Sequence, residues 1–158
     1  MDIWTDISWK NTIANGIRKG IRFRFDKNVD CDVRAACLKY GRWLRNHFDF
    51  PIRVVVYVKD KSRIKAMDGD LVFGTFFRPY LFNVESYIKI AAGDYKIWEG
   101  EEGRNDALAS LLHILSHELT HYFQYINDAR LTPKGEEIQA TKLANKRIAE
   151  YSCCVDEP

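Results

Sequence analysis

Residues 106–127 read DALASLLHILSHELTHYFQYIN, and the spacing of their apolar side chains predicts one long amphipathic helix. On a helical wheel with His117 at zero, the apolar side chains fall between about 120 and 240 degrees. They are Leu108, Leu111, Leu112, Leu115, Leu119, Tyr122, Phe123 and Ile126. The opposite side carries Ser110, His113, His117, Thr120, His121 and Gln124. We therefore expect the apolar side to enter the core and the histidines to face a cleft.

Within this helix, residues 117–121 form the motif HExxH. Residues four positions apart share a helical face, so His117 and His121 can bind one metal ion. Glu118 lies about 100 degrees round the helix, where it can accept a proton from a metal-bound water. The alternative is an amphipathic helix that carries two unrelated histidines. The position of both histidines opposite the apolar side favours a metal site.

The preceding half of the chain contains one helical pattern and several strand-like runs. The helix is predicted over Asp32–Phe48. Strands are predicted at Ile21–Phe25, Ile52–Val58, Leu71–Phe77 and Tyr87–Ala92. Strands followed by helices are typical of an α+β fold. We expect a small, mostly antiparallel sheet with the N-terminal helix, the HExxH helix and a C-terminal ligand helix packed on it.

A last helix follows a turn at Asn127–Leu131. Thr132 is a suitable N-cap and Pro133 suits the first helical position, so this helix should run to about Tyr151. The chain has no internal repeat or Pro/Gly/Ser-rich linker, which predicts a single domain over residues 1–158. Residues 1–104 would form its helix-and-sheet half, residues 105–152 its two metal-binding helices, and residues 153–158 a tail.

Composition excludes several classes of protein. The 158 residues are 46% hydrophobic and 29% charged, which is typical of a globular chain, and the net charge of +2 gives no reason to expect nucleic acid. No apolar run approaches the roughly 18 residues of a membrane helix. The N-terminal stretch MDIWTDISWKN resembles no signal peptide. The four cysteines form no CxxC pair, so we expect a reduced, cytoplasmic protein.

A catalytic zinc site needs a third protein ligand and an open position for water. No histidine follows His121, and the metzincin extension fails because Gln124 and Asn127 replace the required Gly and His. The third ligand is then most simply a downstream carboxylate. The candidates are Asp128, Glu136, Glu137, Glu150, Asp156 and Glu157.

The wheel of the last helix favours Glu137 among these carboxylates. Glu137 lies in the middle of a small, mostly apolar face formed by Ala140, Thr141, Ala144, Ile148 and Tyr151. A carboxylate buried there needs a cation or strong donors, because burying it unpaired costs several kcal/mol. Glu136 points about 100 degrees away and is the second candidate, otherwise a solvated or ion-paired residue. The alternative for Glu137 is a buried acid paired with Arg or Lys.

These residues resemble the gluzincin metallopeptidases, in which HExxH is followed by a Glu on the next helix within an E-x-x-A-x-x-x-A pattern, here Glu137, Ala140 and Ala144. The short chain and its order of elements resemble the minigluzincins. The segments RFDKNVD, PIRVVVYV and IKAMDGDLVFGTFF also resemble a group of uncharacterised bacterial proteins. The resemblance implies a hydrolase of the protease class. Thr141 departs from it, because larger gluzincins often carry there an acid that supports a zinc-bound His.

The sequence thus predicts a zinc-dependent peptidase with one zinc per chain, bound by His117, His121 and Glu137, and with Glu118 as general base. A peptide or protein substrate would add to an exposed sheet edge, for which we expect Tyr87–Ala92. Tyr151 is a candidate donor to the oxyanion, and Tyr122, Tyr125 and other tyrosines compete with it for that role. The alternative is a non-catalytic zinc protein that binds a partner, although such a site has no use for Glu118. Hydrolysis of a non-peptide substrate also stays open.

The tail after Tyr151 is a candidate for a segment that blocks the metal site. Residues 152–158 carry two thiols and two carboxylates, groups that could fill the open position of a zinc ion. The plainer interpretation is a frayed terminus.

Overall fold

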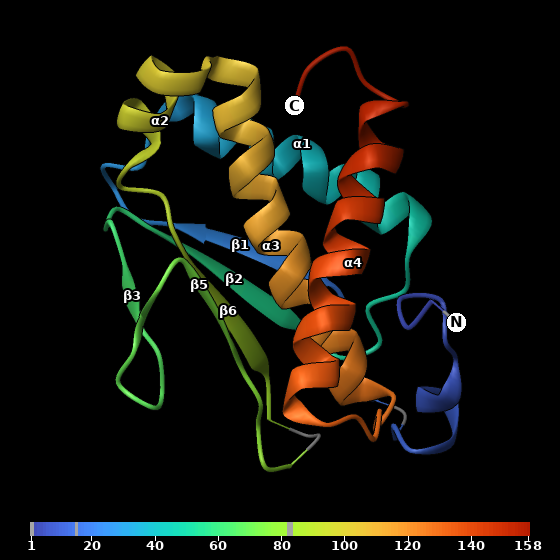
Figure 1. Ribbon diagram of the computed structural model, residues 1–158. Helices are drawn as coiled ribbons and strands as arrows, with labels where there is room; N and C mark the ends of the chain where they lie inside the picture. Colours follow the sequence, from blue (N-terminus) through green and yellow to red (C-terminus); the bar gives the residue numbers. More distant parts are fainter. Residues whose placement is uncertain (1, 15, 82–83) are drawn as a thin grey trace.

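The structure is a computed structural model that describes residues 2–14, 16–81 and 84–158 (Figure 1). Its elements are η1 (Ser8–Asn11), β1 (Ile21–Phe25), α1 (Cys31–His47), β2 (Val54–Lys59), β3 (Ile64–Lys65), β4 (Leu71–Val72), β5 (Gly74–Phe77), β6 (Ser86–Ala91), α2 (Tyr95–Glu102), α3 (Arg104–Ile126) and α4 (Pro133–Ser152). The predicted α+β class is confirmed. In the described residues, no helix has the length and apolarity that crossing a bilayer requires.

The main sheet has the strand order β1-β2-β6-β5, and β3 and β4 form a separate antiparallel pair. The prediction of a mostly antiparallel sheet is wrong for the main sheet. β1 pairs in parallel with β2, and β2 in parallel with β6, whereas β5 and β6 are antiparallel. Parallel neighbours need a crossover connection, and α1 supplies it between β1 and β2. The result is a mixed sheet with β5 at one edge.

Two further predictions about the strands are wrong, those for Leu71–Phe77 and for Tyr87–Ala92. The predicted strand Leu71–Phe77 is divided at Phe73 into β4 and β5. β6 has neighbours on both sides, so the stretch Tyr87–Ala92 is not an edge. The edge nearest to α3 is β5 (Figure 1).

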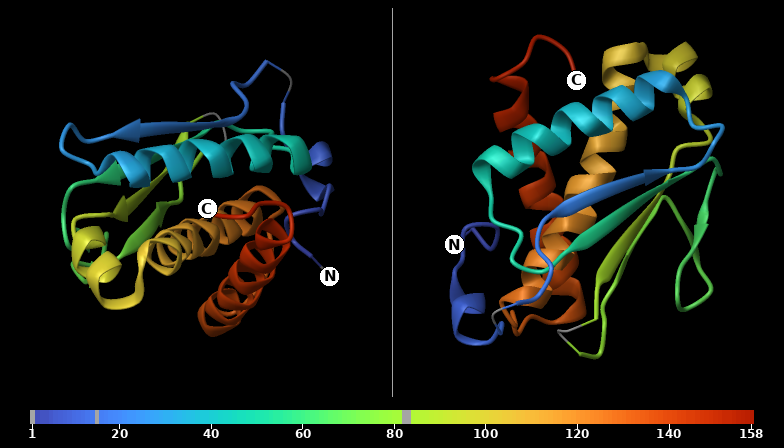
Figure 2. Two further views of the ribbon diagram at one scale, coloured as in Figure 1. Left: turned by 90° about the horizontal axis from the view of Figure 1, so that it is seen from above. Right: turned by 180° about the vertical axis from the view of Figure 1, so that it is seen from behind.

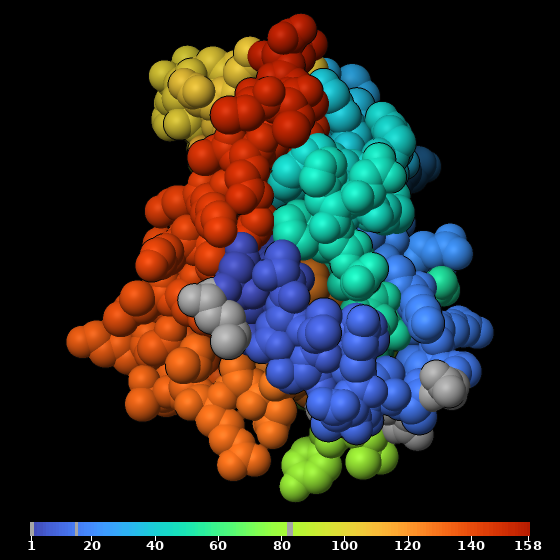
Figure 3. Space-filling view, turned by 90° about the vertical axis from the view of Figure 1, so that its right-hand side faces the viewer, coloured from blue at the N-terminus to red at the C-terminus, as the bar shows by residue number. Residues whose placement is uncertain are grey.

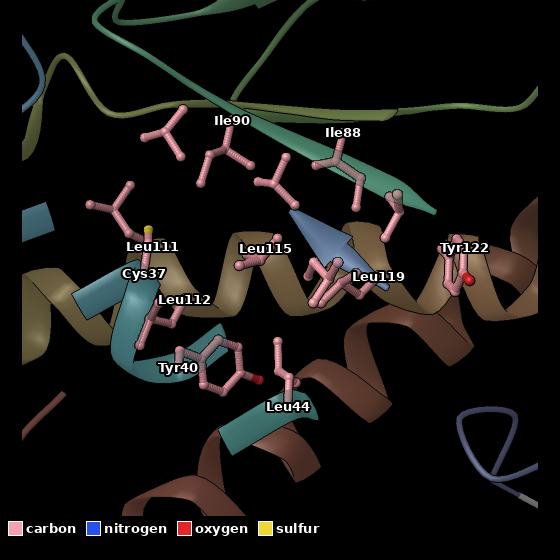
Figure 4. Packing of buried hydrophobic residues seen from close by; sticks show 14 of the residues in the cluster. Cys37, Tyr40, Leu44, Ile88, Ile90, Leu111, Leu112, Leu115, Leu119 and Tyr122 are labelled. Carbon is pink, nitrogen blue, oxygen red and sulfur yellow. The ribbon is translucent and has the colours of Figure 1, made fainter. Parts of the chain in front are cut away.

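Helices α1 and α3 pack on one face of the sheet, and α4 packs on α3 (Figure 2). Strand residues that point toward the helices are fully buried, among them Val54, Val56, Val58, Ile88 and Ile90. Figure 4 shows Leu115 and Leu119 of α3 beneath Ile88, with Tyr40 and Leu44 of α1 on the other side of the helix. The apolar side of α3 therefore occupies the centre of the core, as its periodicity predicts.

The second half of α3 is buried on its polar side as well. Thr120 and Gln124 are almost fully buried, although the wheel places them away from the apolar side. The indole Nε1 of Trp4 donates to Thr120 Oγ1 at 2.9 Å, and the Asn127 side chain donates to the carbonyl of Ile3. The N-terminal segment thus covers Thr120 and lies against α4 (Figure 3), whereas Gln124 bonds to Glu136 and Gln139 of α4. A wheel of one helix cannot reveal such a cover.

The tail does not approach the HExxH motif. Lys39 Nζ donates to the carbonyl of Glu157 at 2.7 Å, and Arg104 lies 3.5 Å from the Glu157 carboxylate. Val155 packs against the core. These contacts hold the tail beside α1 and the start of α3, at the opposite end of α4 from Glu137. The suggestion that residues 152–158 block the cleft is therefore wrong for this structure.

Candidate metal centre

Three potential metal ligands converge where α3 meets the first turn of α4. Nε2 of His117 and Nε2 of His121 lie 3.0 Å and 3.1 Å from the two carboxylate oxygens of Glu137. The donor atoms all lie within 4.8 Å of one another. In a tetrahedral zinc site, bonds of 2.0–2.1 Å place the ligand atoms about 3.3 Å apart. The residues predicted as ligands therefore have a spacing and a chemistry that fit zinc.

Glu137 reaches this place by a different route from the one the sequence suggested. Its side chain is 63% exposed, so the expected burial on an apolar face is wrong. The buried face of α4 is instead formed by Ala140, Leu143, Ala144, Arg147 and Tyr151. The Arg147 guanidinium lies in this face because Asp2 and Glu150 pair with it. Glu137 lies on the rim, where its carboxylate can turn toward the two histidines.

The other candidate, Glu136, has its own partner. Its carboxylate lies 3.5 Å from the guanidinium of Arg78, which follows β5. The structure therefore separates the two neighbouring acids. Glu137 faces the histidines, and Glu136 holds an arginine beside them. The sequence analysis did not single out Arg78, because no local pattern links residue 78 to residue 136.

A hydrogen bond on the far side of its ring orients His121. Nδ1 of His121 lies 2.8 Å from Oε1 of Gln124, and the Gln124 amide donates to the Glu136 carbonyl at 3.1 Å. With Oε1 as acceptor, Nδ1 carries the proton and Nε2 keeps its lone pair for a metal. The sequence analysis used Gln124 only to exclude the metzincin pattern and did not identify it as the residue that orients His121. Thr141, where larger gluzincins carry an acid, is exposed.

The imidazole of His117 is also suited to a ligand. Burial, and then the neighbouring His121, lower the pKa of His117, and these effects outweigh the opposite effect of Glu137. A lowered pKa keeps the ring neutral near pH 7, as metal binding requires.

Glu118 lies next to the ligands and is only 8% exposed. Burial raises the pKa of Glu118 to about 8, the charge of Glu137 adds to the rise, and the backbone N–H of Phe76 opposes it. A divalent cation between the histidines would also oppose the rise, because it favours the carboxylate. Glu118 therefore has the surroundings of a general base that is active only when a metal is bound.

The ligands line a cleft of about 400 Å³, whose other wall is formed by β5 and β4 residues. The strand and α3 are in close contact, because a Cβ at Gly74 would lie 2.8 Å from Cγ2 of Ile114 and 3.1 Å from Cγ of Glu118. The carbonyl of Phe73 accepts from Ala91 N–H at 2.7 Å. In an antiparallel pair such bonds alternate, so the backbone groups of Gly74 and Phe76 face the cleft.

Tyr151 does not belong to the cleft. It is buried against Tyr40 and Trp43 and lies fourteen residues, or roughly 21 Å of helix, from Glu137. The suggestion that Tyr151 serves the oxyanion is therefore wrong. A helical face continues along the whole helix, and the wheel omits the distance along its axis.

Comparison with known proteins adds no assignment to this geometry. No protein-family model matches the chain, and neither a curated protein nor a solved structure matches it.

Proposed function

We propose that the chain is a zinc-dependent peptidase, with one zinc ion bound by His117, His121 and Glu137. The observation that carries the proposal is the convergence of these three donor sets beside a buried Glu118. A purely structural zinc site is closed by four protein ligands, whereas this one offers three. The gluzincin resemblance of the motif supports the same function.

In the proposed reaction, the zinc ion, Glu118 and Arg78 have different roles. Bound zinc would polarise the scissile carbonyl and lower the pKa of the attacking water. Glu118 would accept the proton of that water and deliver it to the leaving amine. Among the described residues that line the cleft, Arg78 carries the one guanidinium, and Glu136 restrains it. Its charge would stabilise the negative charge that develops on the carbonyl oxygen.

The free edge of β5 supports a peptide as substrate. A peptide in extended form can add to this edge as a further strand, which would bring its backbone past Glu118. We also keep the cytoplasm as the proposed location, on the pattern of the cysteines.

The test compares the protein with its Glu118→Gln variant. Both proteins, loaded with zinc, are incubated with a mixed peptide library, and the products are identified by mass spectrometry. We expect cleavage by the unchanged protein and a loss of at least about a thousandfold in the variant, with equal zinc content and an unchanged fold, because an amide accepts no proton. Comparable activity in the two proteins would exclude Glu118 as the base.

The same experiment addresses the alternative, a zinc protein that binds a partner without cutting it. Stoichiometric zinc with no cleavage of any library member by the unchanged protein would favour that alternative. Absence of zinc uptake would exclude both the zinc peptidase and the non-catalytic zinc protein.

A further inference from the structure

A second cavity, of about 740 Å³, lies beside the proposed metal centre, between α2, α3 and α4. Its apolar walls include Phe73, Trp98, Ile114 and Ile148. The ring of Phe73 meets that of Trp98 edge to face, with centroids 5.4 Å apart. We call it the acidic cavity, because three carboxylates also line it, those of Glu101, Glu102 and Asp106.

The charge of the acidic cavity is opposite to that of the whole chain. The net charge is +2, yet no Lys or Arg is among the described residues that line the cavity. No ion pair in the described part of the chain involves its three carboxylates. Two arginines lie close to the cavity walls, and both have other acidic partners. Arg63 covers the Phe73 ring and pairs with Asp94. Arg104, between Glu102 and Asp106 in the chain, pairs with Asp32 and Glu157. The three carboxylates are exposed, and within the described residues no cationic side chain neutralises them.

Two of these acids also lie where they disfavour the fold. Glu101 and Glu102 end α2, and the last turn of that helix contains no basic residue. The C-terminal end of a helix carries partial negative charge, so carboxylates there are destabilising. For Glu102 this cost is partly offset, because Ser110 Oγ donates to its carboxylate at 3.4 Å and the N-terminus of α3 follows at Arg104.

The acidic cavity adjoins the metal centre. Phe73 lines the cavity and its neighbour Gly74 lines the cleft. Across from them, Ile114 lines the cavity, and its Cγ2 lies against the Gly74 backbone. A peptide that follows β5 through the cleft would therefore carry its next side chains into the cavity.

We propose that the acidic cavity receives a lysine or arginine side chain of the peptide substrate. The aliphatic stem of such a side chain would lie on the aromatic and aliphatic walls, and its charged end would meet the carboxylates. An apolar side chain would gain nothing from the three charges, and an acidic one would be repelled. The position of this site relative to the cleaved bond rests on the proposed function, but the binding of a cationic side chain does not.

Distances along α3 set the position of that side chain. Asp106 precedes His117 by eleven residues, which is roughly 16 Å of helix. Three residues of extended peptide cover roughly 10 Å, and a long basic side chain covers most of the remainder. The basic residue would therefore lie two or three positions from the bond that is cut.

The experiment measures binding without cleavage. Zinc-loaded Glu118→Gln protein is titrated with fluorescein-labelled octapeptides that carry lysine, norleucine or glutamate at each position in turn. We expect lysine at one position to bind about tenfold more tightly than norleucine and to lose this advantage in 0.5 M salt, where charges are screened. The same peptides are then tested on a variant without the cavity charges, made by Glu101→Gln, Glu102→Gln and Asp106→Asn.

The control variant changes the net charge equally at distant sites, by Asp49→Asn, Asp60→Asn and Glu85→Gln. The cavity variant should bind lysine and norleucine peptides equally, whereas the control should keep the tenfold preference. The cavity variant removes two acids from the end of α2 and one, Asp106, from the first turn of α3, and these changes act on helix stability in opposite directions. Its thermal midpoint should therefore stay close to that of the unchanged protein, which separates lost binding from lost folding. No preference for lysine, or equal losses in both variants, would overturn the proposal.

The outcome for the proposed peptidase is separate. Binding with the lysine preference, together with no cleavage by the unchanged protein, would overturn the peptidase and support the cavity. Cleavage without any preference for basic residues would support the peptidase and overturn the proposal for the acidic cavity.

Discussion

The two sides of α3 are built on different principles. The side toward the sheet and α1 is a continuous apolar surface, and its leucines at 108, 111, 112, 115 and 119 are at most 1% exposed. The side toward the cleft carries His113, His117, Glu118 and His121, which are held by a few directed contacts. The first side gains stability from close packing. The second keeps a carboxylate buried beside another negative charge, which costs stability. The difference predicts that folding and metal binding can be changed separately.

The largest effect on stability is expected on the packing side. Leu115 is fully buried between the sheet and α1, so Leu115→Ala would leave a cavity in the core. We expect a loss of about 2–5 kcal/mol in the free energy of unfolding, with zinc affinity little changed under conditions where the variant is folded. Urea denaturation measures the first and zinc titration the second.

Leu38→Ala is the matched control, because Leu38 is also a helical leucine but is 40% exposed. Its cost should stay below about 1 kcal/mol. A similar cost for both variants would mean that α3 is not at the centre of the core.

The next effect is a pH dependence that arises on the cleft side. The pKa of Glu118 is raised from 4.5 to about 8 in the metal-free fold, so the folded state binds this proton more tightly than the unfolded chain does. Its contribution to stability is present below pH 4.5 and is lost as the pH rises through about 8. In EDTA, Glu118→Gln should therefore match the unchanged protein near pH 4.5 and exceed it by a few kcal/mol near pH 9.

Denaturation curves of both proteins at several pH values measure this difference. Other titrating groups are common to the two proteins and largely cancel. A difference that stays constant with pH would mean that Glu118 is solvated rather than buried.

A third prediction separates the two neighbouring acids of α4. Glu137→Gln should weaken zinc binding by well over tenfold, because it removes an anionic ligand. Glu136→Gln should leave zinc affinity nearly unchanged, because Glu136 pairs with Arg78 instead. Competition with a chelator of known affinity measures both. An equal loss, or a larger loss at Glu136, would reverse the assignment of the third ligand.

The smallest of these effects concerns Gln124, which orients His121. Gln124→Ala should weaken zinc binding by about tenfold, as is usual when the partner of a metal-bound histidine is lost. Gln124→Glu restores an acceptor for Nδ1 and should recover most of the affinity. Failure of the glutamate to do better than alanine would assign Gln124 a packing role only.

The sequence predicted what depends on local spacing. The apolar side of α3 follows from periods of three and four residues, and the start of α4 follows from Thr132 before Pro133. Glu137 also approaches the histidines, as predicted. Even there, the wheel gave the wrong reason for Glu137, because the burial of α4 depends on which helix covers it. Arg147 is buried on this face because Asp2, far away in the chain, pairs with it, which the wheel of one helix does not indicate.

What the sequence did not predict depends on long-range pairing. Parallel or antiparallel pairing is decided by where each connection returns the chain, so the strand runs alone indicated neither the mixed sheet nor β5 as its edge. Arg78 faces the cleft only because β5 lies at that edge. The acidic cavity likewise depends on α2, a helix that the sequence analysis did not predict.

The central claim is a zinc ion on the cleft side of α3, and the metal content of the protein tests it most directly. Protein purified without chelator and analysed by mass spectrometry for metals should contain about one zinc per chain. His117→Ala should contain none while keeping the circular dichroism of the unchanged protein. A protein that folds normally, contains no metal and takes up no added zinc would contradict the account.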